Sequence, residues 1–437
     1  MPISAIITLL LLIFMVWALM RDRLRPGLVL LTVVVLMLCC GILSPKECLE
    51  GFSNKGMITV ALLFLVSEGV RQSGMLERII NHMMPKEENS LTMASLRIFP
   101  MVSFISAFLN NTPVVVIFAP MIRTWANRVG LAATKLLIPL SYATILGGIC
   151  TLIGTSTNLV VDGMLLDAGM DGFSMFELSK VGIFVCLGGL AYLVGVSRYL
   201  LPDKAYGETD DENRRDAADS TNLSKKKRWM ALVLLVMMVV GATVGELPSV
   251  RKAVPDFRFD MFFFAAITTV IMAWTGMFKT RRYTRYISWD VLITIACAFA
   301  ISKGMTNSGF ADYLASHVIA LSERVSLNHR GIYMMLVVLY VITNIFTELI
   351  TNNAAAALGF PLAMAVAKQL GADPMPFCVC IAVAASAAFS TPIGYQTNLI
   401  VQNEGGYRFT DFVRVGLPLN IIVFIITVLL IPIVYDI

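Results

Sequence analysis

The chain has 437 residues, of which 57% are hydrophobic and only 14% are charged, and its mean hydropathy is +0.77. Soluble domains carry about 25% charged residues. The composition therefore excludes a soluble globular protein and predicts an integral membrane protein. The net charge of +5 does not suggest nucleic-acid binding, so we interpret the basic residues as signals of membrane orientation.

Apolar runs long enough to cross a hydrocarbon core of roughly 30 Å recur along the whole chain. The first run lacks a basic leading region and a small-residue cleavage site, so we expect a retained helix and not a cleaved signal peptide. The predicted spans are 3–20, 27–43, 57–70, 136–165, 177–199, 229–246, 259–278, 289–303, 376–402 and 412–434.

Two further apolar segments, 92–129 and 331–368, are interrupted near the middle by polar residues. The interruptions are "LNNTP" at 109–113 and "ITNNA" at 350–354. Non-helical backbone at membrane depth is tolerated only against protein or a water-filled cavity. Both segments are therefore predicted to be re-entrant helical hairpins.

Four blocks of sequence occur twice in the same order, which predicts an internal duplication. The two hairpin tips resemble each other, and "LIGTSTNLVV" resembles "PIGYQTNLIV". The paired ranges are 66–76 with 301–311, 109–120 with 350–361, 152–161 with 392–401, and 172–182 with 408–416.

Lys and Arg residues set the expected orientation. An outside N-terminus puts "RDRLR", "RQSGMLER", "KKKRW", "KTRRYTRY" and most of the 34 Lys and Arg residues in the cytoplasm. The span beginning at 57 then runs inward and its counterpart beginning at 289 runs outward. Repeats of inverted topology are typical of secondary transporters with a binding site at the membrane midplane. We expect both termini outside, in a plasma or inner membrane.

The predicted fold is an all-α polytopic membrane protein with two inverted-topology repeats, each with a re-entrant helical hairpin and a spanning helix unwound at mid-membrane. "MLERIINHMM" and "FADYLASHVIALSERV" are amphipathic, and we expect them to lie along opposite membrane surfaces. The expected regions are N-terminal helices 1–56, a first repeat 57–200, a flexible cytoplasmic linker 201–228, connecting helices 229–288 and a second repeat 289–437.

The repeated phrase Ile-Gly-x-x-Thr-Asn-Leu places small polar residues inside apolar runs. A helix that breaks at mid-membrane offers N–H groups to anions at one end and C=O groups to cations at the other. Gly154 and Gly394 let carbonyls approach an ion, and amides such as Asn158 and Asn398 offer both donor and acceptor. Such residues also pack membrane helices, but two phrases paired with two amide-rich tips favour a binding site.

The tips together with "LGGICTLIGTSTNLVV" and "TPIGYQTNLIVQNEGGYRFTDFVRVGLPL" resemble the divalent anion:sodium symporter family of the ion transporter superfamily. The resemblance runs from about residue 57 to the C-terminus, and "PIGYQTN" is most similar to the sulfate-permease-like branch. It implies a homodimer in a lipid bilayer, with scaffold and transport domains and an elevator motion. The implied activity is sodium-coupled symport of a small divalent anion, sulfate before dicarboxylate, with sodium as the coupling ion and no other cofactor.

Site residues follow from the same resemblance, position by position. The first sodium site would comprise Ser106, Asn110, Asn111 and Gly154, and the second would comprise Thr347, Asn352 and carbonyls near Ile350 and Gly394. The anion would lie beside Asn111, Thr112, Thr155, Asn352, Asn353, Tyr395 and Gln396. Thr-Ser-Thr-Asn and Tyr-Gln-Thr-Asn replace the Thr-Pro-Pro-Asn of the dicarboxylate branch, which favours sulfate.

Glu348, just before the second tip, leaves two interpretations open: it carries a proton or helps to bind a cation, or it braces the hairpin. The alternative function is a proton-coupled or arsenite-type transporter of the same superfamily. A channel is less favoured, because inverted repeats favour alternating access. The sequence has no G-x-S-x-G or H-E-x-x-H motif and no paired aspartates within its apolar segments, so we do not expect an intramembrane enzyme. Its eight cysteines form no C-x-x-C pair and are expected to be buried thiols, neither disulfides nor metal ligands.

Overall fold

The computed structural model describes residues 1–437 except 22, 77, 80–89, 204–224, 248–249, 251–258 and 326–330. Every regular element in the described residues is helical, so the predicted all-α class is confirmed. Most of the predicted linker and of "MLERIINHMM" lies outside the described residues. Five of the eight cysteines are buried thiols, as predicted, whereas Cys39 and Cys40 are exposed and Cys48 is partly buried.

The first half of the chain forms a series of helices interrupted at two places. α6 and α7 make the first hairpin, and α8 and α9 are separated by the non-helical residues 149–155. The helices are α1 (Ile3–Met20), α2 (Pro26–Cys39), α3 (Pro45–Glu50), η1 (Gly51–Ser53), α4 (Lys55–Gln72), α6 (Leu91–Ser106), α7 (Asn111–Arg128), η2 (Ala133–Lys135), α8 (Leu137–Gly148), α9 (Ser156–Asp167), α10 (Ser179–Gly195) and α11 (Ser197–Leu200).

The second half repeats this order. α18 and α19 make the second hairpin, and α20 and α21 are separated by the non-helical residues 387–395. The helices are α12 (Lys225–Gly245), α14 (Met261–Trp274), η5 (Thr280–Arg282), α15 (Tyr283–Tyr286), α16 (Trp289–Asn307), α17 (Phe310–Val325), α18 (Gly331–Leu349), α19 (Asn352–Leu370), α20 (Met375–Ser386), α21 (Gln396–Gly405) and α22 (Phe409–Tyr435).

The two predicted hairpins and the two predicted helix breaks are therefore present. α12 begins at Lys225, four residues before the expected start of the span near 229. Lysine is a good helix former, and its long side chain can extend from a helix end toward water.

Six helical segments of the described residues are long and apolar enough to cross a membrane, which indicates a multi-pass membrane protein. α8 and α9 have 12 residues each, which is roughly 18 Å of helix, so only the two together cover a hydrocarbon core. The six segments are Ile3–Met20, Pro45–Gln72, Lys225–Gly245, Trp289–Asn307, Ile332–Leu349 and Phe409–Tyr435.

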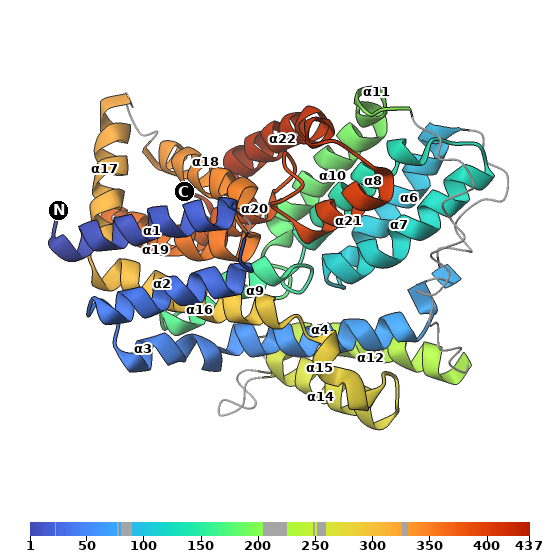
Figure 1. Ribbon diagram of the computed structural model, residues 1–437, viewed down its shortest axis with the longest axis horizontal. Helices are drawn as coiled ribbons and strands as arrows, with labels where there is room; N and C mark the ends of the chain where they lie inside the picture. The colour runs from blue at the N-terminus through green and yellow to red at the C-terminus, as the bar shows by residue number, and fades with distance from the viewer. Residues whose placement is uncertain are drawn as a thin grey trace.

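The helices can be divided into two groups by their packing; Figure 1 shows α4, α12, α14 and α15 along the lower edge of the molecule, with α6, α7, α8, α10 and α22 above them. In one group α2 packs on α1 and α16, and α14 packs on α4 and α12. The other group holds both hairpins and both interrupted helices, with α6 against α8, α18 against α20, and α10 against α22. The groups meet where α16 packs on α19 and α4 packs on α9.

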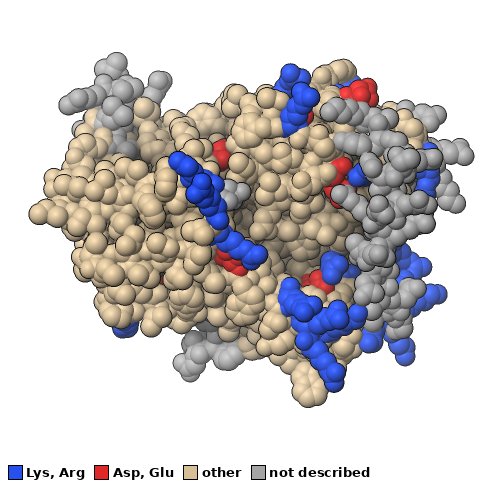
Figure 2. Space-filling model, in the orientation of Figure 1, with Lys and Arg blue, Asp and Glu red and all other residues tan. Residues whose placement is uncertain are grey.

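Charge is unevenly distributed on the face seen in Figure 2. Lys and Arg side chains gather mostly toward the right, over α12 and α15, while the left end near the N-terminus is almost uncharged. Arg281, Arg282 and Arg285 belong to this basic region. Helix α17 stands across the long axis at the opposite end, which is the direction expected of a helix lying along a membrane surface.

Candidate functional site

Four helix N-termini converge on one cavity of about 270 Å³. α7 begins at Asn111, α9 at Ser156, α19 at Asn352 and α21 at Gln396, so the two hairpin tips and the two helix breaks all contribute. The first N–H groups of each helix lack partners within that helix, and they attract anions. The polar residues that line the cavity are Asn110, Thr112, Ser156, Thr157, Asp290, Thr294, Thr351, Asn352, Asn353, Tyr395 and Gln396.

Each hairpin tip contacts the helix break of the other repeat. Thr112 Oγ1 lies 3.4 Å from Gln396 Oε1, and Ser156 Oγ lies 3.2 Å from Asn353 Oδ1. Ser156 and Gln396 hold the same place in the repeated phrase, and Thr112 and Asn353 hold nearly the same place in the two tips. The repeats therefore interlock around a local pseudo-two-fold axis.

The residues that precede α9 and α21 meet at the centre of this arrangement. Thr155 Oγ1 lies 2.9 Å from the hydroxyl oxygen of Tyr395, and the amide of Asn111 lies 2.7 Å from the same oxygen. Thr155, Asn111 and Tyr395 are buried. The hydroxyl of Tyr395, predicted to contact the anion, is therefore held by protein groups, although the residue lines the cavity.

The asparagine of each repeated phrase holds its helix break in shape. Asn158 Nδ2 donates to the carbonyls of Gly148 and Thr151, at 3.2 and 2.8 Å. Asn398 Nδ2 donates to the carbonyls of Ala388 and Thr391, at 2.9 and 3.1 Å. The two sets are equivalent by the repeat. These amide nitrogens thus bind backbone, a role that the sequence pattern alone did not distinguish from ion binding.

Ser106, Asn111 and Gly154 of the predicted first sodium site lie together. The side-chain amide of Asn111 lies 2.6 Å from Ser106 Oγ. The amide atom that faces Ser106 also lies 3.1 Å from the Gly154 carbonyl oxygen and 3.2 Å from that of Thr144. Thr144 was not predicted. Asn110 has no place in this cluster and instead lines the cavity.

The predicted second sodium site has the same plan. Thr347 Oγ1 donates to Asn352 Oδ1 at 2.9 Å, with the same spacing in sequence as Ser106 and Asn111. A Cβ on Gly394 would lie 2.6 Å from the Thr347 carbonyl, so only glycine fits there. Asn352 Nδ2 is a buried donor without a partner among the described residues, and Ile350 lines the cavity.

Comparison with known proteins identifies the family. The sequence model of the citrate transporter family matches residues 9–365 and again 257–436. The chain belongs to the citrate transporter family. It is 26% identical to an uncharacterized transporter of Synechocystis over 93% of both chains. It is 41% identical to a probable sodium/sulfate cotransporter of Chlamydomonas reinhardtii, over 37% of this chain and 19% of that protein.

The fold is similar to the crystal structure of the YdaH transporter of Alcanivorax borkumensis, with a TM-score of 0.61 and 13% identity over 98% of both chains. Membership of the citrate transporter family makes the chain a secondary transporter and not an enzyme. It also agrees with the resemblance to divalent anion:sodium symporters found in the tips and breaks.

In this citrate transporter family member Glu348 lies outside the cavity lining. Its Oε1 accepts hydrogen bonds from the backbone N–H of Phe389 (2.9 Å) and Ser390 (2.7 Å) and from Asn420 Nδ2 (2.6 Å). Glu348 therefore ties the second hairpin to the second break and to α22. Its Oε2 is buried without a partner among the described residues. Asn420, a single amide in the apolar helix α22, was missed although its sequence context could have drawn attention to it.

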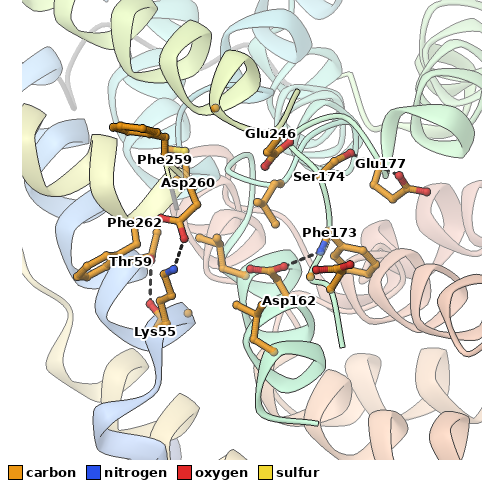
Figure 3. A pocket seen from close by; sticks show the side chains of 18 residues that line it. Lys55, Thr59, Asp162, Phe173, Ser174, Glu177, Glu246, Phe259, Asp260 and Phe262 are labelled. Carbon is orange, nitrogen blue, oxygen red and sulfur yellow. Dashed lines mark hydrogen bonds and ion pairs between the residues drawn. The ribbon is translucent and has the colours of Figure 1, made fainter. Parts of the chain in front are cut away.

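A second cavity, of about 260 Å³, lies between α4, α9, α14 and the segment after α9 (Figure 3). Lys55 pairs with Asp260 there, and Asp162 Oδ1 accepts the N–H of Phe173 at 2.7 Å. Its lining holds the carboxylates Asp162, Asp171, Glu177, Glu246 and Asp260 against the single cation of Lys55. Excess negative charge repels an anion, so the amide-lined cavity is the better anion site.

Proposed function

We propose that the protein couples the entry of sodium to the uptake of a small divalent anion, with sulfate favoured over a dicarboxylate. The observation that carries this proposal is the cavity formed by four helix N-termini and lined mainly by amides and hydroxyls, with Asp290 as the one acidic residue of its lining. Each N-terminus is equivalent to roughly half a positive charge, so four of them offset about the charge of sulfate. Such a site needs no Lys or Arg side chain.

Sodium coupling is supported by the two matching oxygen clusters behind the tips. Each joins a hydroxyl, an amide and a nearby backbone carbonyl, around Ser106 with Asn111 and around Thr347 with Asn352. Hard oxygen ligands suit a hard cation. The name of the Chlamydomonas relative points to the same pair of solutes.

The energetics favour more than one sodium ion. A tenfold sodium gradient contributes about 1.4 kcal/mol per ion. Two ions with one divalent anion are electrically neutral, so the gradient alone would concentrate the anion about a hundredfold. Each further sodium ion adds the free energy of its own concentration gradient and about 2.3 kcal/mol per 100 mV of membrane potential.

Transport by an elevator motion is supported by the two helix groups. In this proposal the group of α1, α2, α4, α12, α14 and α16 is the scaffold, and the group with the hairpins slides along α4 and α16. The cavity is lined by Leu19, Pro26 and Asp290, which adjoin the basic segments "RDRLR" and "KTRRYTRY". With the termini outside, the cavity opens toward the cytoplasm. A homodimer built on the scaffold is part of the same proposal.

The test is uptake of labelled sulfate into proteoliposomes that hold the purified full-length protein. We expect an inward sodium gradient to stimulate uptake, and an equal choline gradient to leave it at the level of empty liposomes. Uptake that is equal with sodium and choline refutes sodium coupling. Competition by unlabelled succinate, citrate and arsenite distinguishes the anions, and competition by succinate but not by sulfate overturns the preferred substrate.

Proton coupling is the second candidate, because Glu348 keeps one buried carboxyl oxygen without a partner. Glu348→Gln preserves an oxygen for the three donors but cannot exchange a proton. If sodium alone is coupled, the variant should keep sodium-driven uptake within a few-fold of wild type. Loss of uptake driven by a proton gradient in this variant, with such uptake present in wild type, would favour the proton-coupled transporter.

A further inference from the structure

Asn111 lies between the first sodium site and Tyr395 and can face them in two ways. With its nitrogen toward the sodium site, it donates to Ser106 Oγ, Thr144 O and Gly154 O at 2.6, 3.2 and 3.1 Å, and its oxygen accepts from the Tyr395 hydroxyl at 2.7 Å. With the amide reversed, Ser106 donates to Asn111 Oδ1, and Asn111 Nδ2 donates to Tyr395. In the reversed orientation the amide oxygen faces the carbonyl oxygens of Thr144 and Gly154, so only the first orientation satisfies the amide when no cation is bound.

A cation selects between these orientations. Only the reversed amide adds an oxygen to those of Ser106 and Gly154, whereas the other orientation points two N–H groups at the cation. Binding of sodium therefore turns the amide nitrogen toward Tyr395. A ligand shifts an equilibrium by its difference in affinity for the two states, and here the affinities differ by one oxygen ligand.

Reversal of the amide reverses a chain of hydroxyl groups. When Asn111 accepts from Tyr395, Tyr395 can accept in turn from Thr155 (2.9 Å), and the Thr155 hydrogen is then turned away from Thr157. When Asn111 donates to Tyr395, the hydroxyl hydrogens of Tyr395 and Thr155 turn the other way, and Thr155 donates to Thr157 (3.5 Å). Thr157 lines the cavity. Only in this second state does its hydroxyl accept a hydrogen bond inside the protein, which directs its own hydrogen toward an anion.

The second repeat lacks such a chain, although it holds equivalent residues. Asn352, the counterpart of Asn111, has its amide nitrogen buried without a partner among the described residues. Thr397, the counterpart of Thr157, likewise has its hydroxyl buried without a described partner. The counterpart of Tyr395 is Thr155, which is too short to play the same part for the second site. Among the described residues, a chain of hydroxyls thus leads from the first cation site to the cavity wall, whereas the second site borders the cavity directly through Ile350, Asn352 and Gly394.

We propose that Asn111, Tyr395, Thr155 and Thr157 form a relay that reports sodium at the first site to the anion cavity. Sodium makes Thr155 donate to Thr157, which directs the Thr157 hydrogen toward the anion and so raises anion affinity. Tyr395 acts here as a positioning residue. The inference rests on the proposed sodium coupling and adds the pathway by which one cation and the anion affect each other.

Tyr395→Phe tests the relay, because it removes the hydroxyl and keeps the ring. Sulfate uptake by proteoliposomes is measured at low and saturating sodium, for wild type and variant. In wild type we expect sodium to lower the KM for sulfate. A hydrogen bond to a charged group accounts for about a tenfold effect, so in Tyr395→Phe this decrease should shrink by about tenfold. Reciprocally, the decrease that sulfate causes in the half-saturating sodium concentration should shrink by the same factor.

Thr155→Val removes the next hydroxyl and should give the same loss of coupling if Tyr395→Phe is poorly folded. Tyr192→Phe is the matched control, because it removes a buried phenol that donates to the Val415 carbonyl at 2.8 Å outside the relay. It should keep the full sodium effect on KM. Sodium-dependent thermal stabilisation of the purified proteins, with and without sulfate, checks the coupling without transport.

The outcomes separate the relay from the proposed function. If wild-type uptake does not depend on sodium, the proposed function fails and the relay fails with it. If wild-type uptake depends on sodium and both Tyr395→Phe and Thr155→Val keep the full sodium effect on KM, only the relay is overturned. A lower maximal rate with an unchanged sodium effect also contradicts the relay, because a structural role alone would produce it.

Discussion

Replacement of Asn398 by alanine should disrupt the second helix break more than the same change at Asn158 disrupts the first. Asn398 is fully buried, and its amide nitrogen donates to two carbonyls while its oxygen accepts from Ser141 at 2.7 Å. Alanine strands three polar groups. Each stranded buried group costs about 1–3 kcal/mol, which places the free energy of unfolding about 3–9 kcal/mol below that of wild type.

At Asn158 the same change strands only two carbonyls, and it removes an amide oxygen that is already buried without a described partner. The expected loss is therefore smaller by about 1–3 kcal/mol. Thermal unfolding of the purified variants should rank wild type above Asn158→Ala and Asn158→Ala above Asn398→Ala, and sulfate uptake in proteoliposomes should follow the same order.

Asn307→Ala is the matched control, because this exposed amide donates to the Ile42 carbonyl and Glu47 Oε1 at one end of the molecule. It should change uptake little. The reasoning is refuted if Asn398→Ala unfolds at the wild-type temperature with wild-type uptake, or if Asn158→Ala is the less stable of the two.

Two further predictions concern contacts between helices. Asn54 caps α4 with its oxygen, while its nitrogen donates to Asp167 Oδ2 at 2.7 Å. Asn54→Asp keeps the cap but loses this donor, so thermal unfolding should show a loss of about 1.5–3 kcal/mol of stability. Adding Asp167→Asn should restore most of that loss, and an additive double mutant would contradict the contact. A Cβ on Gly147 would lie 2.1 Å from the Ser103 carbonyl, so Gly147→Ala should force α6 from α8 and cost about 1–3 kcal/mol. A Cβ on Gly195 would have no neighbour within 4 Å, so Gly195→Ala should unfold like wild type. Equal stability of Gly147→Ala and Gly195→Ala would refute the close contact between α6 and α8.

The sequence was sufficient to predict the hairpins and the helix breaks, because both are marked locally. Polar tips inside apolar segments cannot sit in lipid as ordinary spans, and the duplication let each half support the other. The breaks at 149–155 and 387–395 fall within the two predicted spans that contain the repeated phrase. The contacts within each oxygen cluster, such as Thr347 with Asn352, are also close in sequence.

The contacts between the repeats could not be predicted, because no local pattern encodes them. Thr112 and Gln396 are 284 positions apart, and Ser156 and Asn353 are 197 apart. Which side chain faces which depends on how the two repeats interlock. For the same reason the sequence left the role of Glu348 open, whereas its contacts with the second break and with Asn420 are those of a brace.

Residues that are identical in the two repeats have a different role from those that differ between them. The asparagines that shape the breaks, Asn158 and Asn398, are the same in both repeats, because both breaks need the same two carbonyls held. The residues that meet around the cavity differ: Thr155 faces Tyr395, and Ser156 is matched by Gln396. A symmetric frame thus presents an asymmetric surface to its ligand. In the proposed mechanism an anion near the pseudo-two-fold axis would meet two unlike walls, and the hydroxyls of Tyr395 and Thr155 would connect it to the first proposed cation site alone among the described residues.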